Sequence, residues 1–169
     1  HQRGRLEHEH IKDYLYEGDL LLPVTLTPPA DLVDKLVYAN RILYDQGVVD
    51  GLGHVSARHP TEPGVFLLSC NRAPAMVKRA DITCYDFDGN TVSDTTERPY
   101  LERFIHGEIY RARTDVMAVV HSHSPSVIPF GAARQQLRPI FHMSGFLGEG
   151  SALFDIREKH GDTDMLIRS

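Results

Sequence analysis

The sequence is poor in several features that would mark particular classes of protein. No uninterrupted apolar stretch approaches the roughly 18 residues of a membrane-spanning helix, so we predict no such helix. Residues 1–10 are polar and charged, unlike a secretory signal. Lysine and arginine total 18 against 23 acidic residues. The resulting net charge of −5 argues against nucleic acid or an anionic membrane as the main partner.

Cysteine is also scarce. The two cysteines, Cys70 and Cys84, cannot build a disulfide framework, and each lies in or beside an apolar segment. We therefore predict two buried, reduced thiols and a cytoplasmic location.

The length of 169 residues has room for one domain with a sizeable core. Residues 1–26 are interpreted as an N-terminal extension, and residues 27–169 as the domain. A helix is predicted to begin at Thr27, through a hydroxyl cap followed by two prolines, and to run to about Gln46, where Gly47 ends it.

Strands and helices alternate along the rest of the chain. A second helix is predicted from about Pro99 to Arg113, with an apolar face that includes Phe104 and Ile105. Short turns such as Asp88-Gly89-Asn90 favour a partly antiparallel α/β sheet. Strands are predicted at residues 54–59, 65–69, 82–87, 116–121 and 137–142, with a return strand from Thr91 and a short helix or loop at 125–131.

Two histidines at the end of one predicted strand are the strongest functional signal. His121 and His123 follow the apolar run Ala118-Val119-Val120, and alternate residues of a strand face the same side. Their imidazoles would point out of the strand end together. Because imidazole is the commonest ligand of catalytic divalent metals, the pair is predicted to be half of a metal site.

A carboxylate and a third histidine lie upstream. Glu102 and His106 are spaced i, i+4, which places them on one face of the second predicted helix. A helix packed back on its following strand would bring Glu102 to the two histidines, as a ligand or as a proton donor and acceptor. His106 would take part in the chemistry or orient Glu102.

Four blocks in this order resemble the class II aldolase/adducin family of metal-dependent lyases. They are Gly-His-Val-Ser-Ala-Arg at 53–58, Leu-Leu-Ser-Cys-Asn-Arg at 67–72, Glu-x-x-x-His at 102–106 and Ala-Val-Val-His-Ser-His at 118–123. The resemblance covers residues 30–169. The interval from Glu102 to His121 is also the family's interval between catalytic Glu and first metal His.

The resemblance implies a three-layer α/β/α sandwich around a mostly antiparallel sheet. It makes His121 and His123 two of three metal-binding histidines, with Glu102 as the acid-base group. The third histidine would lie beyond Ser169, so the chain is expected to be incomplete at its C-terminus. The metal would be Mn or Zn, with Fe and Co as further options. The family's homo-oligomers, tetramers or dimers of tetramers, imply active sites at subunit interfaces.

The first two blocks depart from the aldolase pattern in a way that bears on the substrate. His54 stands where the family has Asn, and Ser69-Cys70-Asn71-Arg72 replaces a Thr-Pro-Ser-Gly phosphate turn. The glycine that lets backbone approach a phosphate is absent. Arg72 would clamp a carboxylate with His54. Ser69 is a further substrate-binding residue in this loop, and Ser56 and Arg58 are either scaffolding or substrate contacts.

These changes favour the decarboxylase-like branch of the family, which acts on ortho-hydroxylated aromatic or pyridine dicarboxylates. The predicted function is therefore a metal-dependent carbon–carbon lyase of aromatic compound catabolism, with a small carboxylated substrate. One alternative is an aldolase or dehydratase acting on a small hydroxy-carbonyl compound. An alternative of another class is an adducin-like binding protein without catalysis.

Overall fold

The computed structural model describes residues 26–148, 150–155, 158 and 161. The predicted N-terminal extension lies outside these residues, apart from Leu26. Three 3-10 turns accompany the longer elements: η1 (Pro74–Met76), η2 (Arg79–Asp81) and η3 (His142–Leu147). The helices and strands are α1 (Ala30–Asp45), β1 (His54–Arg58), β2 (Val65–Ser69), β3 (Ile82–Asp86), α2 (Arg103–Ala112), β4 (Ala118–His121) and α3 (Ile128–Ala132).

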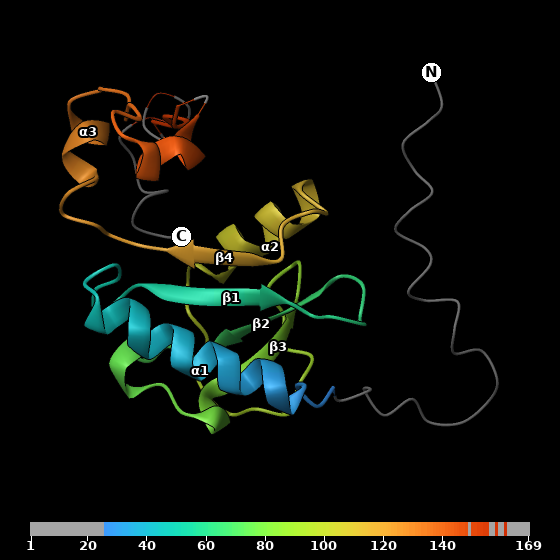
Figure 1. The fold of residues 1–169 in the computed structure, drawn as a ribbon. Coiled ribbons are helices and arrows are strands. Elements are labelled where there is room, and N and C mark those ends of the chain that lie inside the picture. The colour runs from blue at the N-terminus through green and yellow to red at the C-terminus, as the bar shows by residue number, and fades with distance from the viewer. Residues whose placement is uncertain (1–25, 149, 156–157, 159–160, 162–169) are drawn as a thin grey trace, which may run out of the picture.

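Four strands form one antiparallel sheet in the order β3-β2-β1-β4. The chain returns through α2 to place β4 beside β1 (Figure 1). The register pairs His54 with His121 and Ser56 with Val119. The strand that carries the predicted metal ligands therefore lies directly beside the first predicted substrate block.

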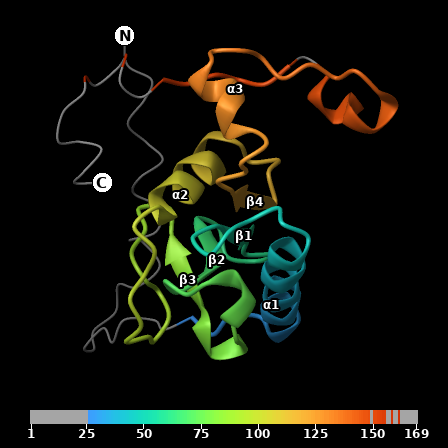
Figure 2. The ribbon, with the colours of Figure 1, turned by 90° about the vertical axis from the view of Figure 1, so that its left-hand side faces the viewer.

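Helices cover both faces of this sheet. Figure 2 shows α1 on one side of the strands and α2 on the other. Because side chains alternate along β1, Val55 and Ala57 face α1, whereas Ser56 faces α2. The prediction of an α/β/α arrangement around a mostly antiparallel sheet is confirmed.

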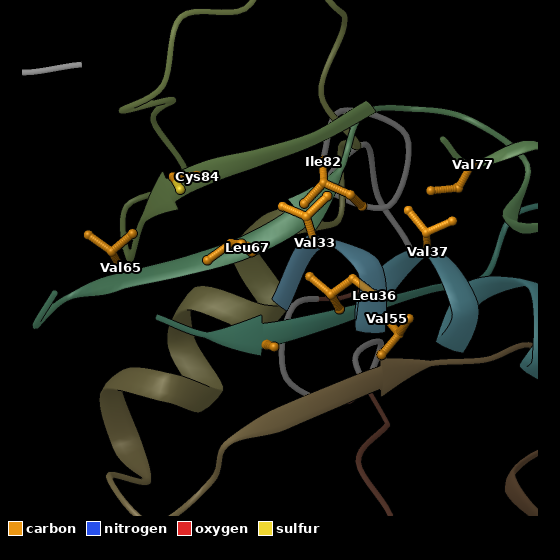
Figure 3. Packing of buried hydrophobic residues seen from close by; sticks show 10 residues of the cluster. Val33, Leu36, Val37, Val55, Val65, Leu67, Val77, Ile82 and Cys84 are labelled. Atoms are coloured by element: carbon orange, nitrogen blue, oxygen red, sulfur yellow. The ribbon is translucent and has the colours of Figure 1, made fainter. Parts of the chain in front are cut away.

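The face toward α1 is an aliphatic core. Val33, Leu36 and Val37 of α1 point at side chains of β1, β2 and β3 (Figure 3). Cys84 lies in this core, and both cysteines are buried free thiols, as predicted. Burial of apolar surface, worth about 25 cal/mol per Å², stabilises the packing of α1 on the sheet.

The face toward α2 is aromatic and polar. Phe66, Tyr85 and Tyr110 form a second buried cluster with Leu68 and Tyr100. A close approach of α2 depends on Gly107, since a Cβ there would lie 2.2 Å from the carbonyl oxygen of Phe87. Glycine at this position therefore lets the helix settle onto the sheet.

The first helix matches its prediction except at its start. Its N-cap is Pro29, with no side-chain hydrogen bond, so the predicted hydroxyl cap from Thr27 is wrong. Two prolines separate the Thr27 hydroxyl from the first helical residue, Ala30. The C-terminal end agrees: Gly47 has a φ of +66°, and the N–H of Val48 bonds back to the carbonyl of Leu43.

The second helix begins at Arg103, four residues later than predicted, and Glu102 is its N-cap. Its buried residues are His106, Gly107 and Tyr110. The predicted apolar face is the open one: Phe104 and Ile105 are exposed. Helical spacing identified a face, but contact with the polar side of the sheet decided which face is buried.

Two predicted strands are not formed. Residues 137–140 are irregular and η3 follows them, so the strand predicted at 137–142 is wrong. The return strand at Thr91 is a single bridge to Tyr85. The turn before it agrees with prediction, with Gly89 at a φ of +79°. Among the described residues, no helix is long and apolar enough to cross a membrane.

Candidate metal centre

The two histidines at the end of β4 converge. Nε2 of His121 and Nε2 of His123 lie 3.0 Å apart. A tetrahedral ion with metal–nitrogen distances of about 2.0–2.1 Å would hold two such atoms about 3.4 Å apart. Both side chains are partly exposed, so an ion has access from solvent. This geometry fits a shared divalent metal.

Glu102 lies beside this pair, brought there by the start of α2. Its Oε1 is 3.5 Å from Nε2 of His121, and its Oε2 is 3.4 Å from Nε2 of His54. The ligand atoms of His54, Glu102 and His121 all fall within 4.8 Å of one another. Imidazole nitrogens and a carboxylate suit Zn, Mn, Fe or Co, and the donor set alone does not choose among them.

Asp50 is a candidate site residue that the sequence patterns did not indicate. Its carboxylate lies 3.2 Å from Nδ1 of His123 and accepts the N–H groups of Leu52 and Gly53, each at 2.9 Å. The N–H of Leu52, above the other causes, lowers the pKa of Asp50. A carboxylate on the outer nitrogen turns the inner nitrogen of a histidine toward a metal. An acid placed just before a Gly-x-Gly loop was the available signal.

The same loop brings β1 against the end of β4. A Cβ on Gly53 would lie 2.6 Å from Cβ of Val49 and 3.0 Å from the carbonyl oxygen of His121. Glycine therefore permits this approach. The imidazoles of His54 and His121 stack with centroids 4.8 Å apart and an interplanar angle of 13°.

A row of hydrogen bonds runs from His54 into the interior. Nδ1 of His54 is 2.8 Å from Nε2 of His106, whose Nδ1 is 2.6 Å from Oγ of Ser56, which is 2.7 Å from the hydroxyl of Tyr110. All four side chains are fully buried. We refer to these four residues as the polar chain. Among the described residues, the hydrogen bonds connect His106 to Glu102 through His54.

Burial controls the protonation of the two histidines in the polar chain. Loss of solvent lowers the pKa of His54 to about 4, and the neighbouring His121 adds to this effect. Loss of solvent, with the neighbouring imidazoles, lowers the pKa of His106 to about 3. Both rings are therefore neutral near pH 7.

Ser56 is fully buried, and Arg58 is half-buried at the end of β1. The Arg58 guanidinium donates to the carbonyl oxygens of Val116, Tyr110 and Arg113 at 3.0, 2.8 and 2.8 Å. It thereby ties β1 to the end of α2 and the start of β4. Of the two roles considered for Ser56 and Arg58, this geometry favours scaffolding.

The second predicted substrate loop contributes less than expected. Nε of Arg72 lies 2.9 Å from Oδ1 of Asp81, and its Nη2 lies 3.6 Å from Glu97. Ser69 is fully buried at the end of β2. The structure does not bring these two side chains into the cluster around Glu102, and their substrate contacts stay predictions.

A cavity of about 340 Å³ opens in front of Glu102 and His123. Tyr100 forms part of its wall and also packs against His54, with ring centroids 4.4 Å apart. The Tyr100 hydroxyl donates to the carbonyl of Arg72, which fixes the second loop at the cavity edge. The lining residues are Leu52, Asn71, Tyr100, Leu101, Glu102 and His123.

Comparison with known proteins identifies related families and folds. Residues 34–164 match the family model described as Class II Aldolase and Adducin N-terminal domain. Decarboxylase tropJ from Talaromyces stipitatus is 38% identical over 147 residues, covering 83% of this chain and 55% of the relative. A 3,4-dihydroxyphthalate decarboxylase from Arthrobacter keyseri is 34% identical over 116 residues, covering 63% of this chain and 46% of the relative. The chain thus spans about half the length of these curated relatives.

Sugar-phosphate enzymes are also related. The L-fuculose phosphate aldolase of Methanocaldococcus jannaschii is 34% identical over 85 residues, covering 50% of this chain and 44% of the relative. Among solved structures, the L-fuculose 1-phosphate aldolase from Glaciozyma antarctica PI12 has a TM-score of 0.64 at 24% identity, covering 73% and 55%. An aldolase II superfamily protein from Pseudomonas syringae has a TM-score of 0.56 at 28% identity, covering 63% and 44%.

Proposed function

Because this chain belongs to the class II aldolase and adducin family, we propose that it is part of a metal-dependent decarboxylase acting on an ortho-hydroxylated aromatic or pyridine dicarboxylate. The observation that carries the proposal is the convergence of His121 and His123 beside Glu102, at an open cavity. Two of the relatives named above are decarboxylases, which supports this branch of the family.

In the proposed reaction, the bond between the ring carbon and a carboxylate breaks, and its electron pair stays on the ring. A divalent ion held by His121 and His123 would supply a Lewis acid for the ring hydroxyl and the neighbouring carboxylate. Carbon dioxide leaves, and a proton must take its place on the ring carbon. We assign that proton to Oε1 of Glu102, the oxygen that faces His121.

The cavity walls suit a planar ring. Leu52, Tyr100 and Leu101 provide apolar surface, while Glu102 and His123 provide polar groups at one end. Arg72 and His54 were predicted to hold the second carboxylate. In the structure the Arg72 guanidinium pairs with Asp81 and stays partly exposed, whereas His54 is fully buried, so a substrate contact with His54 would require rearrangement.

Several finer predictions form part of the same proposal. They are Mn or Zn as the metal, a third histidine ligand beyond Ser169, and a homo-oligomer with active sites at its interfaces. They also include a place in aromatic compound catabolism and a cytoplasmic location. The predictions of the metal, the third histidine and the homo-oligomer follow from the family pattern, in which members are oligomeric, metal-dependent lyases.

The alternative within enzymes is an aldolase or dehydratase acting on a sugar-type substrate, favoured by the match to L-fuculose phosphate aldolases. The second loop weighs against it, because Asn71 and Arg72 replace a phosphate-binding glycine turn. An adducin-like binding protein without catalysis would not need the convergent ligand atoms of His54, Glu102 and His121.

The experiment is to measure carbon dioxide release by the protein reconstituted with Mn or Zn. The substrates are hydroxy-methylpyridine-dicarboxylate and dihydroxyphthalate, with the His121→Ala variant as the control without metal. Release that depends on His121 supports the proposal. Turnover of a sugar phosphate without carbon dioxide release would reverse the order of the two enzyme hypotheses. Failure to take up stoichiometric metal would remove both.

A further inference from the structure

We propose that the polar chain of Tyr110, Ser56, His106 and His54 runs in one direction and ends in a hydrogen on Nε2 of His54. His54 would then donate to Glu102 as a positioning residue, and it would not ligate the metal. The inference rests on the proposed function only in treating Glu102 as the acid-base group. The direction itself follows from counting donors and acceptors.

The geometry allows two sets of metal ligands, one with His54 and one without it. One contains His54, Glu102 and His121, whose ligand atoms lie within 4.8 Å of one another. The other contains His121 and His123, whose Nε2 atoms are 3.0 Å apart. A nitrogen can bind a metal only through its lone pair, so the location of the hydrogen on His54 decides between the sets.

The direction is determined at the buried end of the polar chain. The hydroxyl of Tyr110 is fully buried and has one hydrogen to donate. Among the described residues, its hydrogen-bond partner is Oγ of Ser56, which has lone pairs to accept that hydrogen. Tyr110 must therefore donate to Ser56, because a buried hydroxyl without an acceptor is costly.

Each following bond is then determined in turn. The hydroxyl of Ser56 accepts from Tyr110, so its own hydrogen goes to Nδ1 of His106. A neutral imidazole has one N–H, so His106 carries its hydrogen on Nε2 and donates it to Nδ1 of His54. By the same rule His54 carries its hydrogen on Nε2, which faces Oε2 of Glu102 at 3.4 Å. Each of the two imidazoles is in hydrogen-bond contact through both ring nitrogens, so one nitrogen donates and the other accepts.

The opposite direction fails at both ends. It would leave the Tyr110 hydrogen without an acceptor among the described residues. With no ion between the two atoms, it would also aim the lone pair of His54 Nε2 at a carboxylate oxygen of Glu102, where the two would repel. The two ends of the polar chain therefore favour the same arrangement.

The consequence concerns Glu102. One of its oxygens, Oε2, is held by His54, and the other, Oε1, is left toward His121 and the cavity. His54 is fully buried, so it acts on the reaction through Glu102. The metal-binding nitrogens supplied by the described residues are then those of His121 and His123.

The first test reads the hydrogen positions directly. The full chain, stripped of metal and labelled with ¹⁵N-histidine, is studied by NMR correlations that connect ring nitrogens to carbon-bound protons. Single-histidine variants assign the signals. We expect His54 and His106 to be Nε2–H tautomers. An Nδ1–H tautomer at His54 would overturn the proposal.

Variants test the anchoring of the polar chain at Tyr110. In Tyr110→Phe, the Ser56 hydroxyl is free to accept from His106, so we expect a second, Nδ1–H population of His106 to appear. Tyr85→Phe is the matched control: it removes the phenol hydroxyl of another residue of the same buried cluster, and Tyr85 takes part in none of the three hydrogen bonds of the polar chain. Tautomers unchanged in Tyr110→Phe would contradict the anchoring.

Metal titration of the stripped chain tests the second half of the proposal without any substrate. We expect His54→Gln to bind Zn²⁺ no more than about a hundredfold more weakly than the unmodified chain, the upper limit for an outer partner. His121→Gln should lose more than that. Equal losses in the two variants would make His54 a ligand and overturn the proposal. Neither the NMR measurement nor the Zn²⁺ titration needs turnover. A failure of the decarboxylation assay would therefore contradict the proposed function without affecting the conclusion about His54.

Discussion

The two faces of the four-stranded sheet have opposite chemistry, although the same strands build both. Toward α1, the strands present Val55, Leu67 and Ile82 to an aliphatic helix face. Toward α2, strand β1 presents His54 and Ser56 to a helix that buries a histidine and a tyrosine. Both faces are buried and stabilise the sheet, but the face toward α2 also places polar groups around the candidate metal centre.

The difference shows how a small domain can separate stability from function. Aliphatic packing is tolerant, because hydrophobic side chains of similar volume replace one another at modest cost. A buried hydrogen-bonded row is intolerant, because each donor needs its own acceptor. Strand alternation keeps these two requirements on opposite sides of one backbone.

The largest expected effect lies on the α2 side. Glu102→Gln keeps the shape of the side chain but removes its acid-base capacity, so turnover should fall by about 10²–10⁴-fold while metal stays bound. Steady-state kinetics and metal analysis measure the two quantities. Glu108→Gln, exposed on the same helix, is the control. Activity near that of the unmodified protein would remove Glu102 from the mechanism.

A change on the α1 side should affect stability alone. Leu36 is 3% exposed in the aliphatic core, and Leu36→Ala should lower the free energy of unfolding by about 2–5 kcal/mol. Urea denaturation measures this, with Ile42→Ala at an exposed position of the same helix as control. Metal affinity should be unchanged below the unfolding transition. A loss of metal affinity without a loss of stability would break the proposed division between the faces.

Acidification should act on the α2 side. The pKa of His54 is lowered from 6.5 to about 4 and that of His106 to about 3, so the unfolded chain binds these protons first. Stability should therefore be fully present above pH 6.5 and decline as the pH falls toward 4. The slope is up to about 1.4 kcal/mol per pH unit for each histidine.

Urea denaturation at a series of pH values measures this slope. Leu36→Ala should show the same pH dependence from a lower starting stability, because the aliphatic core holds no histidine. A free energy of unfolding that stays level from pH 7 to pH 5 would refute the prediction.

The smallest effect is expected at the edge of the site. Asp50→Ala removes the carboxylate beside Nδ1 of His123, and metal affinity should fall by about 10–100-fold. Competition with a chromophoric chelator measures it, and Asp45→Ala at the exposed end of α1 is the control. An unchanged affinity would show that Asp50 only supports the loop at Leu52 and Gly53.

Local patterns in the sequence were sufficient to predict most elements. Helical spacing located both long helices, and alternation located β1 and placed His121 and His123 on one side of a strand end. The predictions at residues 137–142 and at the start of α2 were wrong because a local pattern does not show which part of the molecule a segment contacts.

The contacts that build the site join residues far apart in the chain. His54 meets Glu102 and His106 across 48 and 52 positions, and Asp50 meets His123 across 73. No local pattern specifies such pairs. They depend on the register between β1 and β4, and on the approach of α2 that Gly107 permits.

By itself the sequence determined the elements, the family resemblance and the pair of histidines, because backbone hydrogen bonding imposes periods that a single segment reveals. Only the tertiary structure decided that His106 contacts His54, that Arg72 pairs with Asp81, and that Asp50 lies against His123. Those outcomes depend on which side chains the sheet and helix packing bring within hydrogen-bonding distance.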